Sequence, residues 1–221
     1  GGAPAYPASV EELVNAAWAE KQAAMPFLFD GPLWALRSYG ERRDPPRLRV
    51  LLRQTSYRYK TFAKDLLRSR AELRDPDLGR LVEAVQPVGL GVLVFTSDGS
   101  LCIGLRGDRT AVAPGMWHMV GGALDTPDPL SAALREVREE LGLLPEHAGR
   151  DSMEFLGLWD TGEYHGWIPC LVFALSLPVT AEQLERDLWP KAEDHWEHVR
   201  LGFLDMRSPH ALEELEAESR A

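Results

Sequence analysis

The order of hydrophobic and polar residues changes its period several times along this chain. Residues 10–24 repeat at helical spacing, and Ser9 followed by Glu12 predicts a capping box at the start of that helix. The turn-forming sequence Asp30-Gly31-Pro32 then leads into a predicted strand. After a polar loop over residues 41–46, the sequence RLRVLLRQTSY alternates as a second strand.

Two short helices are predicted from Tyr57 to Ala84, separated at Asp75-Pro76. Residues 1–86 are therefore expected to form an N-terminal extension with a helix, strands and two short helices. This extension contains no cluster of catalytic residue types. We expect a structural role for it, either as a lid packed on the rest of the chain or as the element that forms a homodimer.

The body, residues 87–221, begins with GLGVLVFTSDGSLCIGLRG, in which two apolar stretches flank a Ser-Asp-Gly turn and predict a hairpin. A loop with a Pro-Gly turn and a short strand then lead to Gly121-Gly122. Further strands are predicted over 153–159, 168–177 and 198–205, with a short helix over 181–189 and a closing helix over 208–219. Strands and helices that interleave in this way predict an α+β body, with a mixed sheet covered by helices on both faces.

The clearest helix lies between Asp128 and Gly142. Asp128 is a good N-cap, Pro129 suits the first turn because its missing N–H would have no partner there, and Gly142 suits a left-handed exit. The apolar residues of this helix recur at helical spacing: Leu130, Leu134, Val137 and Leu141. This stripe is expected to pack on the core.

Roughly opposite the stripe, the same helix carries Glu136, Glu139 and Glu140. They stand at i, i+3 and i+4, so their negative charges repel one another. Such a group is also typical of a solvated helix face, since Glu is a good helix former. As a functional site, the carboxylates suit Mg²⁺, which binds through carboxylates and substrate phosphates, and the Gly121-Gly122 turn can add a backbone carbonyl.

The stretch from Trp117 to Leu143 resembles the Nudix box, in which Gly, five residues, Glu and seven residues precede Arg-Glu-apolar-any-Glu-Glu-any-Gly-apolar. The second half matches in order at Arg135, Glu136, Val137, Glu139, Glu140, Gly142 and Leu143. The first half departs from the pattern, because strict register places Gly121 on the box glycine and Pro127 where the first Glu belongs. If Gly122 is aligned instead, the loop is one residue short and Asp128 is the nearest carboxylate.

The resemblance implies a Nudix-type α/β/α sandwich and hydrolysis that depends on Mg²⁺, with Mn²⁺ as an alternative ion. Glu136 and Glu140 are the first choice for metal ligands, with Glu139 the third and the Gly121 carbonyl the fourth. The irregular loop then affects the rate, the number of metal ions or the loop geometry rather than the class of reaction.

Two further roles follow from the resemblance. Arg135 is expected to orient a glutamate, and an ordinary surface ion pair is the alternative. Nudix enzymes place the general base either on the box helix, which offers Glu139 and Glu140, or on a later loop. The candidates outside the box are Glu197, Glu193 and Glu163, and for each of them a solvated carboxylate is the alternative.

Candidate substrate contacts lie on either side of the box. Arg106 and Arg109 follow the hairpin and are placed to meet a diphosphate or a sugar, although such arginines also solvate loops. Trp117, Trp159, Tyr164 and Trp167 are candidates for stacking on a base. Aromatic residues on strands more often belong to the core.

The composition of the chain limits the binding partners and the cellular location that we expect. A net charge of −10 argues against binding to nucleic acid and fits a protein that meets an anionic substrate through a metal ion. No stretch approaches the roughly eighteen apolar residues of a membrane span, and no signal peptide opens the chain, so the expected location is the cytoplasm. Cys102 and Cys170 stand in apolar runs, which favours buried thiols over a disulfide, and no His and Cys spacing predicts a zinc site.

These features predict a pyrophosphohydrolase that cuts a nucleoside diphosphate linked to a further group. The helix, the LFDG turn, the strand ending near Arg53 and TSYRYKTF look similar to the N-terminal part of a Nudix branch that includes UDP-glucose and UDP-galactose diphosphatases. A UDP-sugar is therefore the first candidate substrate, and ADP-ribose, dinucleoside polyphosphates, CoA and oxidised nucleotides are rivals.

The alternative function is a Nudix-fold module that binds or senses a nucleotide without cleaving it, or cleaves it only weakly. The three intact glutamates argue against this alternative, and the irregular loop at residues 126–128 argues for it.

Overall fold

The computed structural model describes residues 6–43, 46–68, 76–110, 113–144, 146–160, 168–211, 213 and 217. The chain divides into two compact units, each of which is described by itself. The first unit comprises Gly1–Gly89, Ala123–Pro127 and Leu158–Cys170, and the second comprises Leu90–Gly122, Asp128–Gly157 and Leu171–Ala221. The first unit thus includes the predicted extension together with three short segments of the predicted body, residues 87–89, 123–127 and 158–170.

Three helices form the core of the first unit: α1 (Ala8–Ala24), α2 (Tyr57–Arg68) and α3 (Pro76–Ala84). Their buried side chains make one cluster of Val10, Val14, Tyr59, Ala63, Leu81 and Val85. The predicted capping box is wrong, because α1 begins at Ala8 with Pro7 as its N-cap and no side chain caps it. Proline has no N–H and a fixed φ, so the helix begins directly after it and Ser9 lies inside the first turn.

A long antiparallel hairpin, β1 (Pro32–Arg43) and β2 (Pro46–Ser56), completes the first unit. Glu41 to Arg43 belong to β1, so the loop predicted over residues 41–46 is too long. The hairpin is held to other parts of its own unit, since the Trp34 N–H donates to the Leu124 carbonyl and the Trp34 carbonyl accepts from the Val88 N–H.

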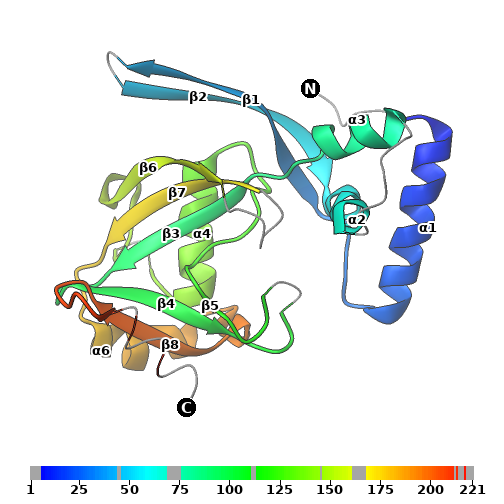
Figure 1. Ribbon diagram of the computed structural model, residues 1–221. Coiled ribbons are helices and arrows are strands. Elements are labelled where there is room, and N and C mark those ends of the chain that lie inside the picture. Colours follow the sequence, from blue (N-terminus) through cyan, green and yellow to red (C-terminus); the bar gives the residue numbers. More distant parts are fainter. Residues whose placement is uncertain are drawn as a thin grey trace. The chain divides into compact units, whose positions relative to one another are not determined.

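The second unit is organised around a mixed sheet, as predicted (Figure 1). Its strands are β3 (Gly89–Phe95), β4 (Ser100–Arg106), β5 (Trp117–His118), β6 (Met153–Asp160), β7 (Pro169–Ser176) and β8 (His198–Asp205). The strand order is β5-β4-β3-β7-β6, and β8 pairs with β4. The pair β3 and β4 is the predicted antiparallel hairpin, whereas β3 and β7 run in the same direction, with the Leu177 N–H bonded to the Phe95 carbonyl beyond their carboxyl ends.

Helix α4 (Pro129–Leu141) has the predicted ends. Asp128 is the N-cap and accepts from the Ser131 N–H, and Gly142 ends the helix in the left-handed conformation with φ 69°. Gly142 is also required because a Cβ atom there would lie 2.3 Å from the Leu188 carbonyl oxygen. Of the predicted stripe, Leu134, Val137 and Leu141 are buried and Leu130 is half-buried.

The segment after β7 is helical but irregular. A short α6 (Ala181–Gln183), capped by Thr180, continues as a π-helical turn η2 (Leu184–Leu188) and a 3-10 turn η3 (Trp189–Lys191). One continuous helix was predicted over residues 181–189, but Pro190 donates no hydrogen bond to the Arg186 carbonyl and its ring crowds that carbonyl, which lies within the π-helical turn. Two further 3-10 turns are η1 (Arg150–Ser152) and η4 (His195–Glu197), and both η3 and η4 pack against α4.

Cys102 and Cys170 are both buried and unbridged. In the described residues, no helix has the length and apolar character needed to cross a membrane. Half of the predicted closing helix over residues 208–219 lies outside the described residues, and residues 208–210 are not helical.

Candidate active site

Helix α4 carries the three glutamates, and their exposure differs. The side chains of Glu136 and Glu139 are 16% and 29% exposed, whereas that of Glu140 is only 4% exposed. The interpretation of the three as one face opposite the apolar stripe is therefore wrong for Glu140. At 3.6 residues per turn, Glu140 follows Val137 by less than one turn and lies next to Leu141, so it turns toward the interior.

The Gly121-Gly122 turn lies directly against two of these carboxylates. The Gly121 N–H donates to Glu140 Oε1 at 3.2 Å. Gly121 has φ 146°, and a Cβ atom there would come within 2.1 Å of the Leu90 carbonyl oxygen. A Cβ atom on Gly122 would lie 2.6 Å from Glu136 Oε2. Both glycines are therefore needed for the turn to approach the helix this closely.

Burial and mutual repulsion raise the pKa of two of the carboxyl groups. The pKa of Glu140 is well above its usual range because of burial first, and then because of the nearby charges of Glu136 and Glu197. Its Oε2 atom is buried and makes no hydrogen bond. Burial also raises the pKa of Glu139; Arg135 opposes this shift and Asp194 adds to it. A hard divalent cation fits this set of carboxylates, because its positive charge would offset both their burial and their mutual repulsion.

Arg135 bridges two of the glutamates. Its guanidinium lies 3.2 Å from Glu136 Oε1 and 3.4 Å from Glu139 Oε2. Arg135 therefore offsets part of the negative charge of Glu136 and Glu139 in this structure. Among the described residues, no three His, Cys, Asp or Glu side chains are gathered closely enough to hold a metal ion as they stand.

The start of β8 brings a fourth carboxylate to this region. Glu197 in η4 forms an ion pair with Arg106 of β4 at 3.2 Å, and its backbone carbonyl accepts from the Gly107 N–H. Burial raises the pKa of Glu197, Arg106 lowers it and Asp194 raises it. Of the other base candidates, Glu193 is exposed and contributes to the raised pKa of Glu139, and Glu163 lies outside the described residues.

His198 is the neighbour of Glu140 that sequence reasoning missed. Its side chain is completely buried, and Nε2 lies 3.6 Å from Glu140 Oε2. Burial lowers the pKa of His198 to about 4, with Arg106 and His118 acting in the same direction. A Cβ atom on Gly104 would lie 2.3 Å from the imidazole ring. A single glycine inside a strand such as LCIGL indicates a close approach of this kind, and it was the available signal.

Some of the predicted substrate contacts lie in the first unit and some in the second, and others lie outside the described residues. Arg106 is largely buried and contacts Glu197, whereas Arg109 is exposed in the turn after β4. Trp117 has the Arg200 guanidinium 5.0 Å above its ring and Gly202 close by. Trp159 is half exposed in the first unit, and Tyr164 and Trp167 lie outside the described residues.

A hollow of about 490 Å³ in the second unit shares Arg106 with this region. It is lined by Leu105, Arg106, Gly107, Asp108, Gly115, Val199 and Arg200. The charged residues of its lining are two arginines and one aspartate, and one of the arginines, Arg106, is paired with Glu197.

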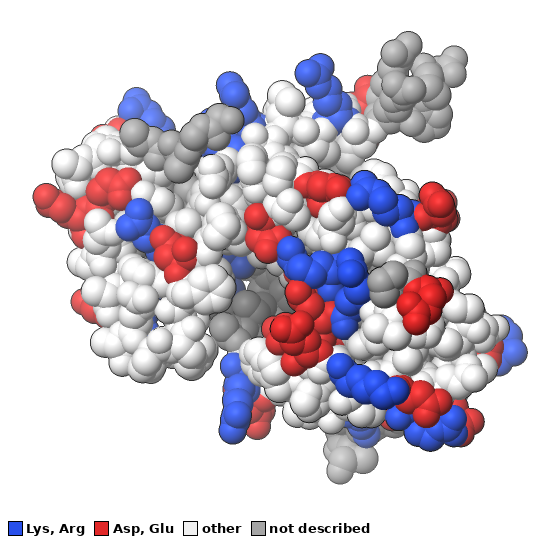
Figure 2. Space-filling view, turned by 180° about the vertical axis from the view of Figure 1, so that it is seen from behind, with Lys and Arg blue, Asp and Glu red and all other residues white. Residues whose placement is uncertain are grey.

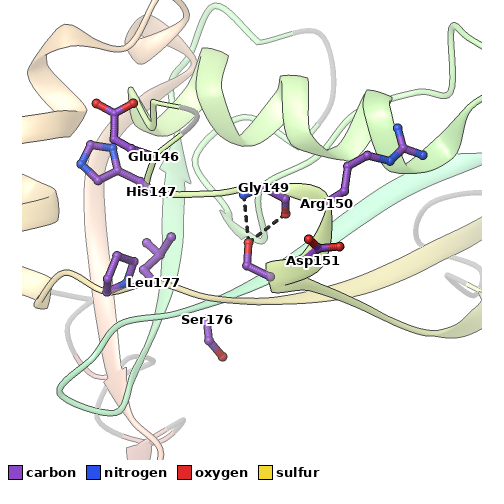
Figure 3. Close-up of a pocket in the computed structure, with 9 residues that line it drawn as sticks. Glu146, His147, Gly149, Arg150, Asp151, Ser176 and Leu177 are labelled. Atoms are coloured by element: carbon purple, nitrogen blue, oxygen red, sulfur yellow. Dashed lines mark hydrogen bonds between the residues drawn. The ribbon is translucent and has the colours of Figure 1, made fainter.

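A larger hollow of about 520 Å³ contains none of the predicted site residues (Figure 3). It is lined by Glu146, His147, Gly149, Arg150, Asp151, Ser152, Ser176, Leu177 and Pro178. Its polar groups contact one another or their neighbours, since the Ser152 hydroxyl bonds to the backbone of Gly149 and Arg150 pairs with Asp128. The candidate site is therefore assigned to α4 and the start of β8.

Asp128 does not replace the missing glutamate of the box. Its carboxylate accepts from Ser131 and lies 3.0 Å from the Arg150 guanidinium, and these hydrogen bonds lower its pKa to about 2. Asp128 therefore caps the N-terminus of α4, at the opposite end of that helix from Glu140.

Comparison with known proteins identifies the family of this chain. The sequence model of the NUDIX domain matches residues 85–218, more than half of the 221-residue chain. An uncharacterized Nudix hydrolase of Pseudomonas aeruginosa is 40% identical over 77 residues, which are 34% of this chain and 41% of that protein. The uridine diphosphate glucose pyrophosphatase NUDT22 of Mus musculus is 27% identical over 139 residues, 61% of this chain and 45% of that protein. The chain thus spans less than half the length of either curated relative.

Solved structures with a similar fold include a bifunctional NMN adenylyltransferase/ADP ribose pyrophosphatase of Francisella tularensis. It has 13% sequence identity and a TM-score of 0.43, with 74% of this chain and 48% of that chain covered. A MutT protein of Methanosarcina mazei has 13% identity and a TM-score of 0.41, with 61% and 92% covered. Because the matched NUDIX domain covers more than half of the chain and includes the helix with the three glutamates, this protein belongs to the Nudix family.

Proposed function

We propose that this protein is a pyrophosphohydrolase that depends on Mg²⁺ or Mn²⁺ and cuts the phosphoanhydride of a nucleoside diphosphate linked to a further group. One observation carries the proposal: Glu140 is a buried carboxylate with a raised pKa and an oxygen that makes no hydrogen bond, next to Glu136 on the same helix. Such a group is costly in an interior unless a proton or a cation compensates it. Membership of the Nudix family supports a cation, rather than a proton, as the compensating charge.

The glutamates and the double-glycine turn would hold the ion. Glu136, Glu139 and Glu140 supply carboxylate oxygens, and the Gly121 carbonyl is the fourth proposed ligand. A bound divalent ion neutralises charge on the diphosphate and makes a coordinated water more acidic. The protein's own part is to hold Glu140 through the Gly121 N–H and to keep Arg135 between Glu136 and Glu139.

Glu197 is the proposed general base outside the helix, with Glu139 and Glu140 as the alternatives on it. Burial raises its pKa, and a carboxylate with a raised pKa accepts a proton better near neutral pH. Its ion pair with Arg106 fixes its direction at the edge of the hollow that Arg106 and Arg200 line.

A UDP-sugar is the proposed substrate, with ADP-ribose, dinucleoside polyphosphates, CoA and oxidised nucleotides as rivals. The name of the mouse relative, a uridine diphosphate glucose pyrophosphatase, supports this choice. The pair of Arg106 and Arg200 suits phosphate oxygens, and Trp117 beneath Arg200 suits a planar or sugar ring.

The surface charge supports a small anionic substrate rather than a nucleic acid. On the face that Figure 2 draws, Asp and Glu side chains lie among Lys and Arg side chains. Ion pairs such as Arg186–Glu182 and Arg207–Asp205 join the two signs. With a net charge of −10, binding to a phosphate backbone would be repulsive overall. We also propose a cytoplasmic location and leave a homodimer as the alternative to a monomer.

A nucleotide-binding module without turnover is the second candidate. Pro127 stands where the box has its first Glu, and the carboxylate of Asp128 is engaged by Ser131 and Arg150. The loop therefore supplies one carboxylate fewer to the region than the family's box does.

Hydrolysis in ¹⁸O-labelled water tests the proposal. The protein is incubated with Mg²⁺ or Mn²⁺ and a panel of nucleotide substrates, and products are identified by mass spectrometry. A UDP-sugar should give UMP and a sugar 1-phosphate, with the label in a phosphate group. UDP and a free sugar labelled at its anomeric carbon would contradict attack at phosphorus. Nucleotide binding without turnover of any substrate would favour the binding module instead.

A further inference from the structure

The His198 ring lies beside Glu140, in a space that exists because residue 104 has no side chain. His198 is the first residue of β8 and pairs with Arg106 of β4 just past an irregularity in the strand register. Its ring lies over Gly104, where a Cβ atom would come within 2.3 Å of a ring carbon and 2.6 Å of Nε2. Any side chain at Gly104 would therefore push the ring out of this place.

Three polar atoms of His198 and Glu140 are enclosed here without a hydrogen bond. Both ring nitrogens of His198 and Oε2 of Glu140 are buried without a hydrogen-bond partner. The two side chains face each other, with 3.6 Å between Nε2 and Oε2. A buried polar atom that makes no hydrogen bond destabilises a fold by about 1–3 kcal/mol, so this arrangement requires a compensating role.

The geometry fixes the direction of the contact between the two side chains. A neutral imidazole has one N–H donor and one acceptor nitrogen. A carboxylate that binds a cation is ionised and only accepts hydrogen bonds, so the N–H then belongs on Nε2, the nitrogen that faces Glu140. A separation of 3.6 Å is too long for a hydrogen bond, and a shift of Glu140 by roughly half an ångström would close it.

We propose that His198 is a positioning residue for Glu140, whose Oε2 it holds through Nε2–H while the Gly121 N–H holds Oε1. Each carboxylate oxygen then keeps a lone pair for the ion, and two donors set the plane of the carboxylate: His198 at the start of β8 and Gly121 in the turn after β5. This inference rests on the metal role of Glu140 in the proposed function. Partners that orient a metal ligand in this way typically change metal affinity by about 10–100-fold when they are removed.

Binding of Mn²⁺ to the whole protein without substrate, followed by electron paramagnetic resonance of the free ion, tests the proposal. His198→Met removes the donor at similar volume and should weaken Mn²⁺ binding by about 10–100-fold. His198→Gln keeps an N–H near the position of Nε2 and should recover most of the affinity. His210→Gln, at an exposed histidine, is the matched control and should bind as the wild type does.

A measurement on the wild type covers the case in which a variant does not fold. With ¹⁵N-labelled histidine and Mg²⁺ present, the NMR signals of His198 should show the proton on Nε2, and the N–H signal should differ from that of the metal-free protein. A proton on Nδ1, or equal Mn²⁺ affinity in the wild type and His198→Met, would overturn the inference. A wild type that binds no Mn²⁺ would overturn the proposed function as well, whereas binding that ignores His198 overturns this inference alone.

Discussion

Replacing Glu140 with Gln tests the site at its most buried member. The change keeps the size of the side chain and the acceptor for the Gly121 N–H, and it removes one negative charge from a group that is 4% exposed. We expect kcat to fall by about a hundredfold or more, which corresponds to about 2.7 kcal/mol in the activation barrier, because a charge that holds the ion in the transition state is lost.

The same variant should be at least as stable as the wild type when no metal ion is present. Burial raises the pKa of Glu140, and the charges of Glu136 and Glu197 add to the shift, so the ionised group is destabilising in the folded state. A gain of about 1 kcal/mol would raise the Tm of a chain of this size by about 2–4 °C.

The assay measures kcat and KM at increasing Mg²⁺, together with Tm in the presence of a chelator. Glu154→Gln, at an exposed glutamate of β6, is the matched control and should leave all three values unchanged. Turnover above about a third of the wild type at saturating Mg²⁺ would refute the assignment of Glu140 as a ligand. A clear loss of stability without metal would show instead that Glu140 has a structural role.

Two further changes test the architecture. Asp128→Ala should lower Tm at neutral pH, because it removes the cap of α4. The pKa of Asp128 in the folded protein is about 2, below its unfolded value, so the stability that its carboxylate contributes is present above about pH 4 and is lost as the pH falls through 2. A difference in Tm between wild type and variant that is the same at pH 2 as at neutral pH would contradict this. Deletion of residues 1–85 removes Trp34, which bonds to Val88 and Leu124, and should leave insoluble protein in a sedimentation assay; a soluble, active remainder would contradict the structural role of the extension.

Sequence pattern predicted the elements where local chemistry determines them. The ends of α4 follow from Asp128, Pro129 and Gly142, and the hairpin β3–β4 follows from its Ser-Asp-Gly turn. The start of α1 was missed because Pro7 fixes the backbone two residues before Ser9, the polar cap that the pattern offered. The length of β1 was missed because cross-strand pairing with β2 continues through polar residues that look like a loop.

Of the candidate site, the sequence predicted only the part that lies on helix α4. Spacing along α4 places Glu136, Glu139 and Glu140 near one another, but the burial of Glu140 depends on what β4 and β8 bring to it. Those strands are distant in sequence, and their register decides that His198 meets Gly104 and that Glu197 meets Arg106. Pairing between strands is a tertiary property, so a pattern read along the chain does not contain it.

The position of Glu140 is itself an argument for function over packing. A residue between Val137 and Leu141 on a helix that covers a core is best filled by an apolar side chain, which would need no donor from Gly121. Here the chain places a carboxylate at that position and a buried histidine opposite it, with a glycine in β4 that makes room for the ring. Each of these three choices weakens the fold when taken alone, since a buried charge, an unbonded imidazole and a strand glycine all destabilise it. In the proposed function, a cation bound by Glu140 would offset its buried charge, and a contact between Glu140 and His198 Nε2–H would satisfy one imidazole nitrogen and explain the space at Gly104.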